Sequence, residues 1–302
     1  MKIGLVDIDS KIPNLALMKL STYYKNKGHK VELTSPLFAK QYDEIYASQV
    51  FDFTPTPSFP ENAFIGGSGV SLDIKLGDEI ENCRPDYFLY KKNDFALGYT
   101  SRGCNRKCPW CVVPQKEGKF RVIGDIYDFW AVGIKRNGHR YWDEQWLDHI
   151  MLLDNAINTD EQHFLKICSQ IENHTLWVDF NQGLDIRLFS EIQAQALDRI
   201  RLKLWKQIHF AWDLIQIEKH VRRGIKILDR YRLKSKSMFY VLIGFNSTPE
   251  EDLYRVETLR GLGIDPFVMP YDKFDNYQRR FARWVNHKAI FKSVKWENYG
   301  IA

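Results

Sequence analysis

The stretch at residues 102–113 reads RGCNRKCPWCVV, and it decides how the rest of the chain is interpreted. Three of the five cysteines, Cys104, Cys108 and Cys111, fall within eight positions in it. Cysteine thiolates are the ligands of iron–sulfur clusters, and a short loop can wrap several of them around one cluster. Three protein ligands leave one coordination position open for a substrate or a cofactor. The spacing therefore predicts a metal or cluster site with an open position.

The same three cysteines could instead form a structural zinc site, lie buried and inert, or take part in a disulfide. Structural zinc takes four ligands, and the nearest further candidates, Cys83 and His139, do not lie at a recognised spacing. The residues between the first two cysteines are polar, which disfavours inert burial. A disulfide would leave one thiol over. We assign no role to Cys83 or Cys168, and we expect Cys168 on the apolar side of its helix.

The composition is that of an ordinary globular protein, with 44% hydrophobic and 27% charged residues in 302. No apolar run approaches the roughly 18–20 residues that span a bilayer. The N-terminus, MKIGLVDIDSKIP, lacks the apolar core of a signal peptide. Clustered cysteines in an odd total number indicate a reducing compartment. We therefore expect a cytoplasmic protein without membrane association.

The first 94 residues predict a small Rossmann-like unit. KIGLVDI is an apolar strand, a helix follows over about 13–27 and ends before Gly28, and HKVELTS is the next strand. Short strands are expected at DEIYAS, NAFIGGS and DYFLY, and TPTPSFPEN is a proline-rich loop. A βαβ unit followed by short strands is typical of a compact parallel sheet.

From residue 95 the chain alternates longer strands and helices. The expected strands are 95–99, 149–154, 176–180, 207–212, 237–245 and 266–271, and helical patterns cover 159–173 and 248–263. Six strands alternating with helices predict a parallel sheet, open or curved into a partial barrel, over 95–275. A C-terminal helical extension is expected over 276–302. Ligands of such sheets bind at the C-terminal ends of the strands.

The cysteine loop resembles the hallmark of the radical S-adenosylmethionine (SAM) enzymes, C-x3-C-x-aromatic-C after the first strand of a (βα)6 partial TIM barrel. Here the motif is CNRKCPWC, with Trp110 in the aromatic position. The resemblance implies that the three cysteines hold a [4Fe–4S] cluster and that SAM occupies the fourth iron. It also implies reductive cleavage of SAM to a 5′-deoxyadenosyl radical, with an electron donor such as flavodoxin or ferredoxin.

The resemblance extends to residues that follow later strands and implies SAM contacts for them. Asp154 and Asn155 in LLDNAIN match a motif that binds the SAM amino group, and the alternative is an ordinary turn with a helix cap. DFNQGLDIRLF follows the third strand and implies ribose and carboxylate contacts, whose alternative is a surface salt bridge. These residues are Asn181, Gln182, Asp185 and Arg187.

Weaker matches follow the last three strands. Asp213 is a candidate for the same polar site. Ile243 and Gly244 partly match a region that packs on adenine, without the first glycine of that pattern, and Met269 lies where backbone contacts to adenine occur in the family. An apolar strand end also needs no ligand to explain it.

The N-terminal unit resembles the cobalamin-binding-type domain that precedes many radical SAM barrels. The D-x-H-x-x-G motif that supplies a histidine ligand to cobalt is absent, because no histidine precedes His29. A degenerate domain is therefore the favoured interpretation, and cobalamin is unlikely.

The substrate stays open, with nucleic acid or a nucleotide among the candidates. Residues 199–236 hold 12 Lys and Arg against 3 Asp and Glu. Such a basic region attracts nucleic acid, although a solvated helix surface has the same composition. The C-terminal stretch YQRRFARWVNHKAIFKSVKWENY interleaves cations and aromatics, which fits stacking on bases or a packed structural cover.

Two functions of different class remain. The first is a radical SAM enzyme that acts on an unidentified substrate. The second is a non-catalytic iron–sulfur or zinc protein that binds nucleic acid through the basic region. A SAM-binding set at Asp154, Asn155 and Arg187 would distinguish them, since a pure nucleic-acid binder needs no such set.

Overall fold

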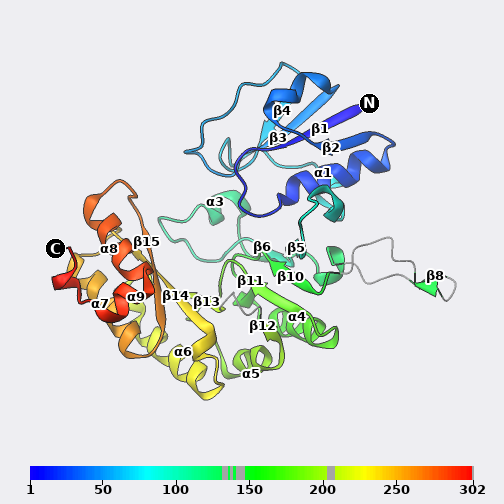
Figure 1. Cartoon of the computed structure of the whole chain (residues 1–302). Helices are drawn as coiled ribbons and strands as arrows, with labels where there is room; N and C mark the ends of the chain where they lie inside the picture. Colours follow the sequence, from blue (N-terminus) through cyan, green and yellow to red (C-terminus); the bar gives the residue numbers. More distant parts are fainter. Residues whose placement is uncertain (131–134, 137–138, 141–146, 203–207, 301–302) are drawn as a thin grey trace. The chain divides into compact units, whose positions relative to one another are not determined.

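The chain consists of two compact units in a computed structural model, which describes residues 1–130, 135–136, 139–140, 147–202 and 208–300 (Figure 1). The first unit comprises Met1–Tyr99, Gln115–Gly118 and Gly124–Ile150. The second comprises Thr100–Pro114, Lys119–Ile123 and Met151–Ala302. The cysteine loop belongs to the second unit.

The first unit is built on a four-stranded parallel sheet in the order β2-β1-β3-β4. The strands are β1 (Lys2–Asp7), β2 (Lys30–Leu33), β3 (Glu44–Ser48) and β4 (Ala63–Gly66). Helix α1 (Leu15–Asn26) crosses from β1 to β2, and the side chain of Asn14 caps it by accepting from the amide of Leu17. Gly28, at φ +81°, allows the reversal after the helix. The predicted Rossmann-like arrangement of this unit is confirmed.

The prediction of a strand at residues 86–90 is wrong, because this segment forms the 3-10 helix η2 (Tyr87–Leu89). The side chain of Asp86 accepts a hydrogen bond from the amide of Phe88 and so starts the turn. Such a local side-chain contact competes with strand pairing. The other short elements of the unit are η1 (Pro36–Gln41), α2 (Asp78–Glu81), η3 (Ile126–Asp128), β8 (Lys135–Arg136) and β9 (His139–Arg140).

Two further sheets follow in the order of the chain. One has four strands in the order β12-β11-β10-β5, and the other has three parallel strands in the order β13-β14-β15. The strands are β5 (Ala96–Gly98), β10 (His149–Leu152), β11 (Trp177–Phe180), β12 (Arg201–Leu202), β13 (Ile208–Ala211), β14 (Ser237–Ile243) and β15 (Asp265–Pro270). Parallel strands joined by helices are confirmed. Closure into one six-stranded barrel stays a prediction, and the first residue of the predicted strand 207–212 lies outside the described residues.

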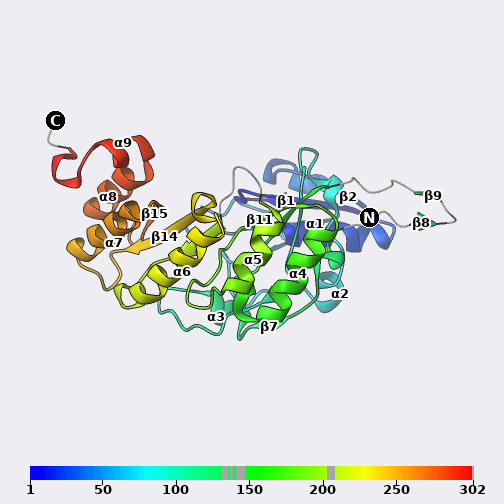
Figure 2. The same cartoon turned by 90° about the horizontal axis from the view of Figure 1, so that it is seen from below.

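The helices of the second unit begin at residues suited to capping. They are α4 (Glu161–Asn173), α5 (Glu191–Arg199), α6 (Glu218–Arg230), α7 (Pro249–Gly261), α8 (Asn276–Asn286) and α9 (Lys288–Ser293). Thr248 and Glu251 form a capping box at the start of α7, and Asp160 caps α4. Helices α4, α5 and α6 lie side by side (Figure 2). Both predicted helices, over 159–173 and 248–263, are confirmed.

The side chains of β14 alternate between buried and half-buried positions. Phe239, Val241 and Ile243 are fully buried, whereas the side chains between them are half-buried. Burying every second side chain is what a strand with one helix-covered face requires. The remaining elements of this unit are β6 (Ser101–Arg102), β7 (Arg121–Val122), η4 (Ile157–Thr159), η5 (Ile215–Ile217), η6 (Lys234–Lys236) and η7 (Trp296–Asn298). Helix α3 (Val113–Glu117) follows the cysteine loop.

The C-terminal extension packs through its aromatic side chains. Phe281 and Trp284 are completely buried, and the indole nitrogen of Trp284 donates to the carbonyl of Val294 over 2.9 Å. The rings of Trp284 and Trp296 lie 5.3 Å apart. These aromatics contact one another, which agrees with the expected packed cover. Among the residues described, no helix is both long and apolar enough to cross a bilayer.

Candidate cofactor site

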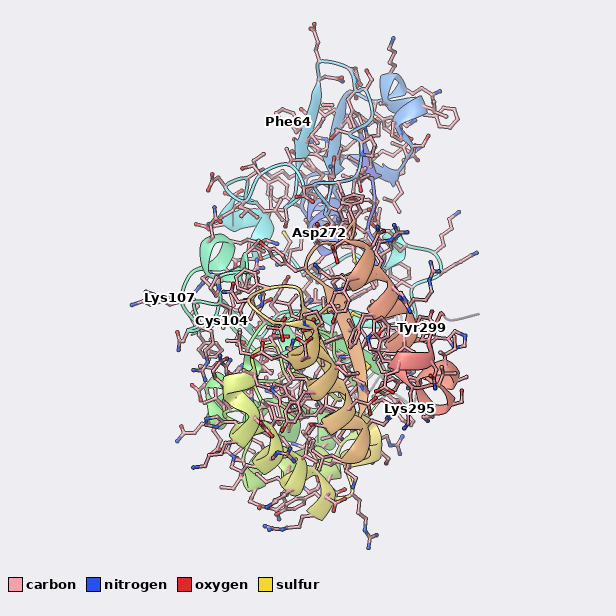
Figure 3. The ribbon with its side chains drawn as sticks, turned by 90° about the vertical axis from the view of Figure 1, so that its left-hand side faces the viewer. Phe64, Cys104, Lys107, Asp272, Lys295 and Tyr299 are labelled. Carbon is pink, nitrogen blue, oxygen red and sulfur yellow. The ribbon has the colours of Figure 1, made fainter. Side chains whose placement is uncertain are left out.

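The cysteine loop connects two short antiparallel strands, β6 and β7. Strand β6 pairs with β7, and Gly103, at φ +78°, turns the chain between β6 and Cys104. The loop is also tied back to the hairpin, since the amide of Phe120 donates to the side chain of Asn105 over 3.2 Å. The side chain of Lys107 points away from Cys104 (Figure 3). The hairpin and the turn thus fix where the cysteines begin.

The three thiols are all free, and they share one electrostatic environment. Burial raises the pKa of Cys108, Arg187 lowers it, and the other two thiols raise it. Burial also raises the pKa of Cys111. In the described part of the chain, no three His, Cys, Asp or Glu side chains are placed to hold a metal ion directly. Three thiols in one short loop nevertheless form a donor set suited to an iron–sulfur cluster, and the guanidinium of Arg187 favours the thiolate of Cys108 against the effect of burial.

The zinc alternative gains no fourth ligand from the described residues. Cys83 belongs to the first unit, at the end of α2, where its thiol contacts the carbonyl of Glu79. The side chain of His139 lies outside the described residues. Cys168 is fully buried on α4, as expected, and burial raises its pKa far above the usual value.

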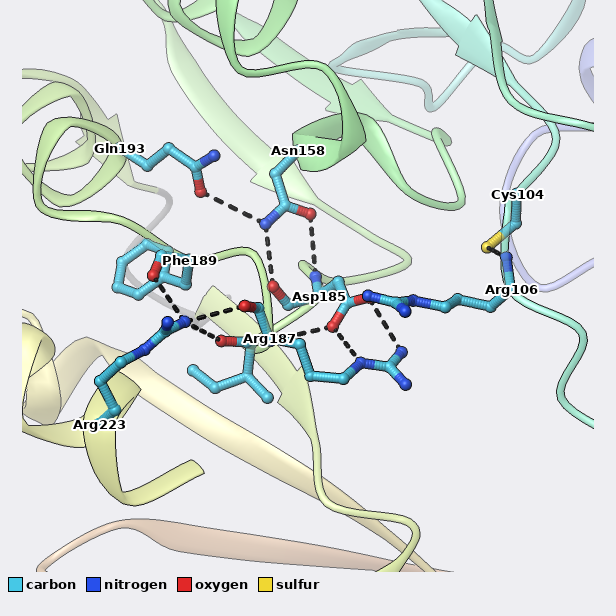
Figure 4. Close-up of polar contacts among 9 residues, drawn as sticks. Cys104, Arg106, Asn158, Asp185, Arg187, Phe189, Gln193 and Arg223 are labelled. Atoms are coloured by element: carbon cyan, nitrogen blue, oxygen red, sulfur yellow. Dashed lines mark hydrogen bonds and ion pairs between the residues drawn. The ribbon is translucent and has the colours of Figure 1, made fainter. Parts of the chain in front are cut away.

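Asp185 lies between two arginines (Figure 4). Arg187 approaches it with Nε at 2.7 Å and Nη2 at 2.9 Å, and Nε of Arg106 in the cysteine loop lies 3.0 Å away. Burial would raise the pKa of Asp185, but the hydrogen bonds and charge of Arg187 hold it below its usual range. The salt bridge considered as an alternative is therefore present. Burial lowers the pKa of the Arg187 guanidinium, but Asp185, and after it the charges of Cys108 and Cys104, raise it above its usual value.

Asn158 braces this loop and was missed by the sequence analysis. Its amide nitrogen donates to the carbonyl of Asp185 over 3.0 Å, and its side-chain oxygen accepts from the amide of Asp185 over 2.9 Å. Gln193 on α5 accepts from the same amide group. Asn158 is 1% exposed, and a buried amide needs such partners. No spacing in the sequence links it to Asp185.

The buried carboxylate of Asp154 accepts hydrogen bonds from neighbouring residues of the protein. It is 3% exposed, and its Oδ1 accepts from the amide and the hydroxyl of Ser101 and from the hydroxyl of Thr100. Burial raises its pKa, and the hydrogen bonds of Ser101 and Thr100 oppose that shift. This carboxylate anchors the start of the β6 hairpin, so its predicted contact with a SAM amino group stays a prediction. Asn155 beside it is half-buried.

Asp213 lies within electrostatic reach of the cysteines, since its charge raises the pKa of both Cys108 and Cys111. Burial raises the pKa of Asp213 itself, and Oδ1 accepts from the amide of Leu242 over 3.1 Å. The fold thus brings the ends of β11 and β13 to the cysteine loop. Asn181 and Gln182 also follow β11, and their side chains bond to each other over 3.0 Å.

The residues predicted to contact adenine are Ile243, Gly244 and Met269, and Trp110 occupies the aromatic position of the cysteine motif. Ile243 is fully buried, so its side chain faces the packed interior. Gly244, at φ +78°, leaves no room for a β-carbon because the amide of Gln278 would lie 2.2 Å from it. Met269 is 46% exposed, and Trp110 packs edge-on against Phe245 with ring centroids 5.1 Å apart. Trp110 and Met269 can therefore meet a ligand through their side chains.

Arg255 on α7 is a second residue that the sequence analysis missed. It is completely buried and pairs with Asp252 at 2.6 Å. Its guanidinium also donates to the carbonyls of Trp212, Asp213 and Leu242 over 2.7–2.9 Å. One buried arginine thus holds the carboxyl ends of β13 and β14, where Asp213 meets the cysteines.

Comparison with solved structures gives a likeness of fold. The radical SAM methyltransferase TsrM from Kitasatospora setae, solved with cobalamin and a [4Fe–4S] cluster bound, superimposes with a TM-score of 0.62. The match covers 89% of this chain and 74% of that one, at 12% sequence identity. This chain therefore shares the fold of a radical SAM methyltransferase. No family model and no curated protein sequence matches it.

Proposed function

We propose that this chain is a radical SAM enzyme in which Cys104, Cys108 and Cys111 hold a [4Fe–4S] cluster. One observation carries the proposal. The C-x3-C-x-aromatic-C loop follows a strand and lies beside Arg187 and Asp213, which follow β11 and β13. The fold shared with a radical SAM methyltransferase supports it.

The bound cluster would supply one electron for cleavage of the carbon–sulfur bond of SAM. Arg187 is the residue suited to the SAM carboxylate, because Asp185 engages only its Nε and Nη2 and leaves Nη1 directed elsewhere. Asn155, Asn181 and Gln182 provide amide donors and acceptors at strand ends. Asp185 and Asn158 keep Arg187 in position, so their role is orientation of the binding group. Trp110 and Met269 supply apolar surface for the adenine.

The first unit raises the question of whether this chain binds cobalamin. The neighbour was solved with cobalamin bound. The first unit of this chain has no histidine before His29, so we propose that it holds no histidine-ligated cobalamin. Incubation with hydroxocobalamin followed by gel filtration tests this, because co-elution with the shifted absorbance of histidine-ligated cobalt would contradict it.

The deciding experiment is anaerobic. The protein is reconstituted with iron and sulfide, SAM and a strong reductant are added, and 5′-deoxyadenosine is quantified. Formation is expected in the wild type and in Cys83→Ala, and it is expected to vanish in Cys108→Ala. Both variants lose one thiol, so the comparison isolates the loop. Zinc in place of a four-iron cluster, with salt-dependent nucleic-acid binding, would instead support the non-catalytic binding protein.

A further inference from the structure

Helix α6 presents an exposed row of positive charges. Lys219, Arg223 and Lys226 are exposed and stand at positions i, i+4 and i+7, which share one face of a helix. The opposite face is buried through Val221, Gly224, Ile225, Ile227 and Leu228. Seven helical steps of about 1.5 Å separate Lys219 from Lys226, so the row is about 10 Å long. We call these three residues the basic stripe.

The charges around the basic stripe are already paired. Arg222 binds Glu218 at 2.6 Å, Arg230 binds Glu191, and Asp229 binds Lys234 at 2.8 Å. Within the described ranges, neither lysine of the stripe has a carboxylate at salt-bridge distance. Glu218, Lys219, Arg222, Arg223 and Lys226 line one surface hollow. Glu218, Glu191 and Asp229 therefore form ion pairs with other residues. Among the described residues, the positive charges of the basic stripe have no carboxylate partner.

The basic stripe contacts the loop that carries Arg187. Nη2 of Arg223 donates to the carbonyl of Arg187 over 2.8 Å and also reaches the carbonyl of Phe189 at 3.3 Å (Figure 4). Gly224 lets this loop approach, because a β-carbon there would lie 2.2 Å from Cδ1 of Ile186. The side chain of Arg187 in turn binds Asp185 over 2.9 Å, and Asp185 accepts from Arg106 of the cysteine loop over 3.0 Å. The stripe thus contacts the backbone of Arg187, whose side chain belongs to the candidate cofactor site.

We propose that the basic stripe is the docking surface for an acidic one-electron carrier protein that reduces the cysteine site. This rests on the proposed function. In the transfer the carrier would be oxidised by one electron and the [4Fe–4S] cluster held by the three cysteines would gain that electron, with no atom or proton moving between them. Complementary charges on the two surfaces steer such an encounter.

The size of the stripe favours a carrier protein over a nucleic acid. Three free charges suit the small, charge-steered interfaces of redox encounters, which bury less than about 1,200 Å². A nucleic-acid surface neutralises several phosphates, commonly about 6–10 in a specific complex. The carbonyl contact to Arg187 also places the surface close to the site that needs the electron.

The test uses a double charge reversal that spares Arg223, because that residue also braces the loop. Lys219→Glu/Lys226→Glu is compared with Lys292→Glu/Lys295→Glu, an equal change of charge at two exposed lysines in the C-terminal extension. The probe is a flavodoxin of net negative charge. Its binding to the apoprotein is measured by calorimetry at low salt, and binding is expected to weaken about tenfold or more in the first variant only.

The activity arm separates this inference from the proposed function. With dithionite, both reconstituted variants are expected to form 5′-deoxyadenosine as the wild type does, whereas with reduced flavodoxin only the stripe variant slows, by about tenfold. No product with dithionite would overturn the proposed function, and the calorimetry would still judge the surface. Equal flavodoxin binding by all three proteins would overturn the inference. Loss of single-stranded RNA binding in the stripe variant, with flavodoxin binding unchanged, would identify a nucleic-acid surface instead.

Discussion

The hydroxyl of Thr100 donates to Oδ1 of Asp154 over 2.8 Å and also lies 2.9 Å from Nε2 of His163. Because the only hydroxyl proton of Thr100 is directed at the carboxylate, Nε2 of His163 is the donor in the second contact. His163 belongs to α4, and Asp154 follows β10. The network therefore ties the first residues of the β6 hairpin, and with it the cysteine loop, to two other elements.

Removal of the Asp154 carboxylate is expected to destabilise the fold itself, whether or not a ligand is bound. Asp154→Ala leaves the buried donors of Thr100 and Ser101 without an acceptor, and each unsatisfied group costs roughly 1–3 kcal/mol. We expect the free energy of unfolding, measured with urea on the apoprotein, to fall by at least about 3 kcal/mol. Asp198→Ala, at an exposed position on α5, should leave it nearly unchanged. Equal stability of both variants would contradict an anchoring role.

Asn155 offers the cleaner test of SAM binding at this strand end. It is half-buried beside Asp154 at the end of β10, so part of its surface is open to a ligand. We expect Asn155→Ala to weaken SAM binding about tenfold, the effect of one lost hydrogen bond to a charged group. Equilibrium dialysis of SAM against the reconstituted protein measures it. Unchanged SAM affinity, with the cluster intact, would remove Asn155 from the proposed site.

Arg255 is expected to be the most sensitive charged residue of the second unit. Arg255→Met leaves Asp252 buried without its partner and three strand-end carbonyls without a donor, so we expect a loss of about 3–5 kcal/mol in unfolding free energy. Adding Asp252→Asn should recover part of that loss, since it removes the buried charge but not the unmatched carbonyls. Arg222→Met, at an exposed pair, should cost less than about 1 kcal/mol. Urea unfolding of the three variants tests this order.

The sequence predicted the parts of the molecule whose signals are local. Strand patterns, helix caps such as Thr248 and the cysteine spacing all lie within short segments, and the structure places these elements as expected. The strand expected at 86–90 failed because one local contact, from Asp86 to the amide of Phe88, outweighs an apolar pattern of five residues.

The supporting contacts of the site could not be predicted, since their partners are distant in the sequence. Asp154 binds a threonine 54 positions earlier, and Arg255 binds a carbonyl 43 positions earlier. An arginine on a helix ordinarily faces water, and nothing around Arg255 in the sequence indicates that strand ends surround it. The polar residues of the candidate site were found because each follows a strand, a position that sequence patterns do indicate.

The charge of Asp185 gives a prediction of pH dependence. Burial raises its pKa, but Arg187 holds the net value below the ordinary 3.8. The unfolded chain then binds more protons than the folded one in this range, so stability falls as pH falls through it. We expect Asp185→Asn to be less stable than the wild type at pH 6, and the two unfolding free energies to converge below about pH 4. Parallel curves, like those expected for Asp198→Asn, would contradict the ion pair.

Gly224 is expected to be required by the close approach of α6 to the loop of Arg187. An alanine would favour the helix by about 1 kcal/mol, but its β-carbon would lie 2.2 Å from Cδ1 of Ile186. We therefore expect Gly224→Ala to lower the free energy of unfolding by about 1–3 kcal/mol. Ile186→Ala removes both Cδ1 and Cγ1, which would lie 2.2 and 2.7 Å from the new β-carbon, so Gly224→Ala should cost less in an Ile186→Ala background than in the wild type. Gly261→Ala, at a helical glycine with open space around it, should be neutral or stabilising, and a stabilising Gly224→Ala would show that the loop can move away.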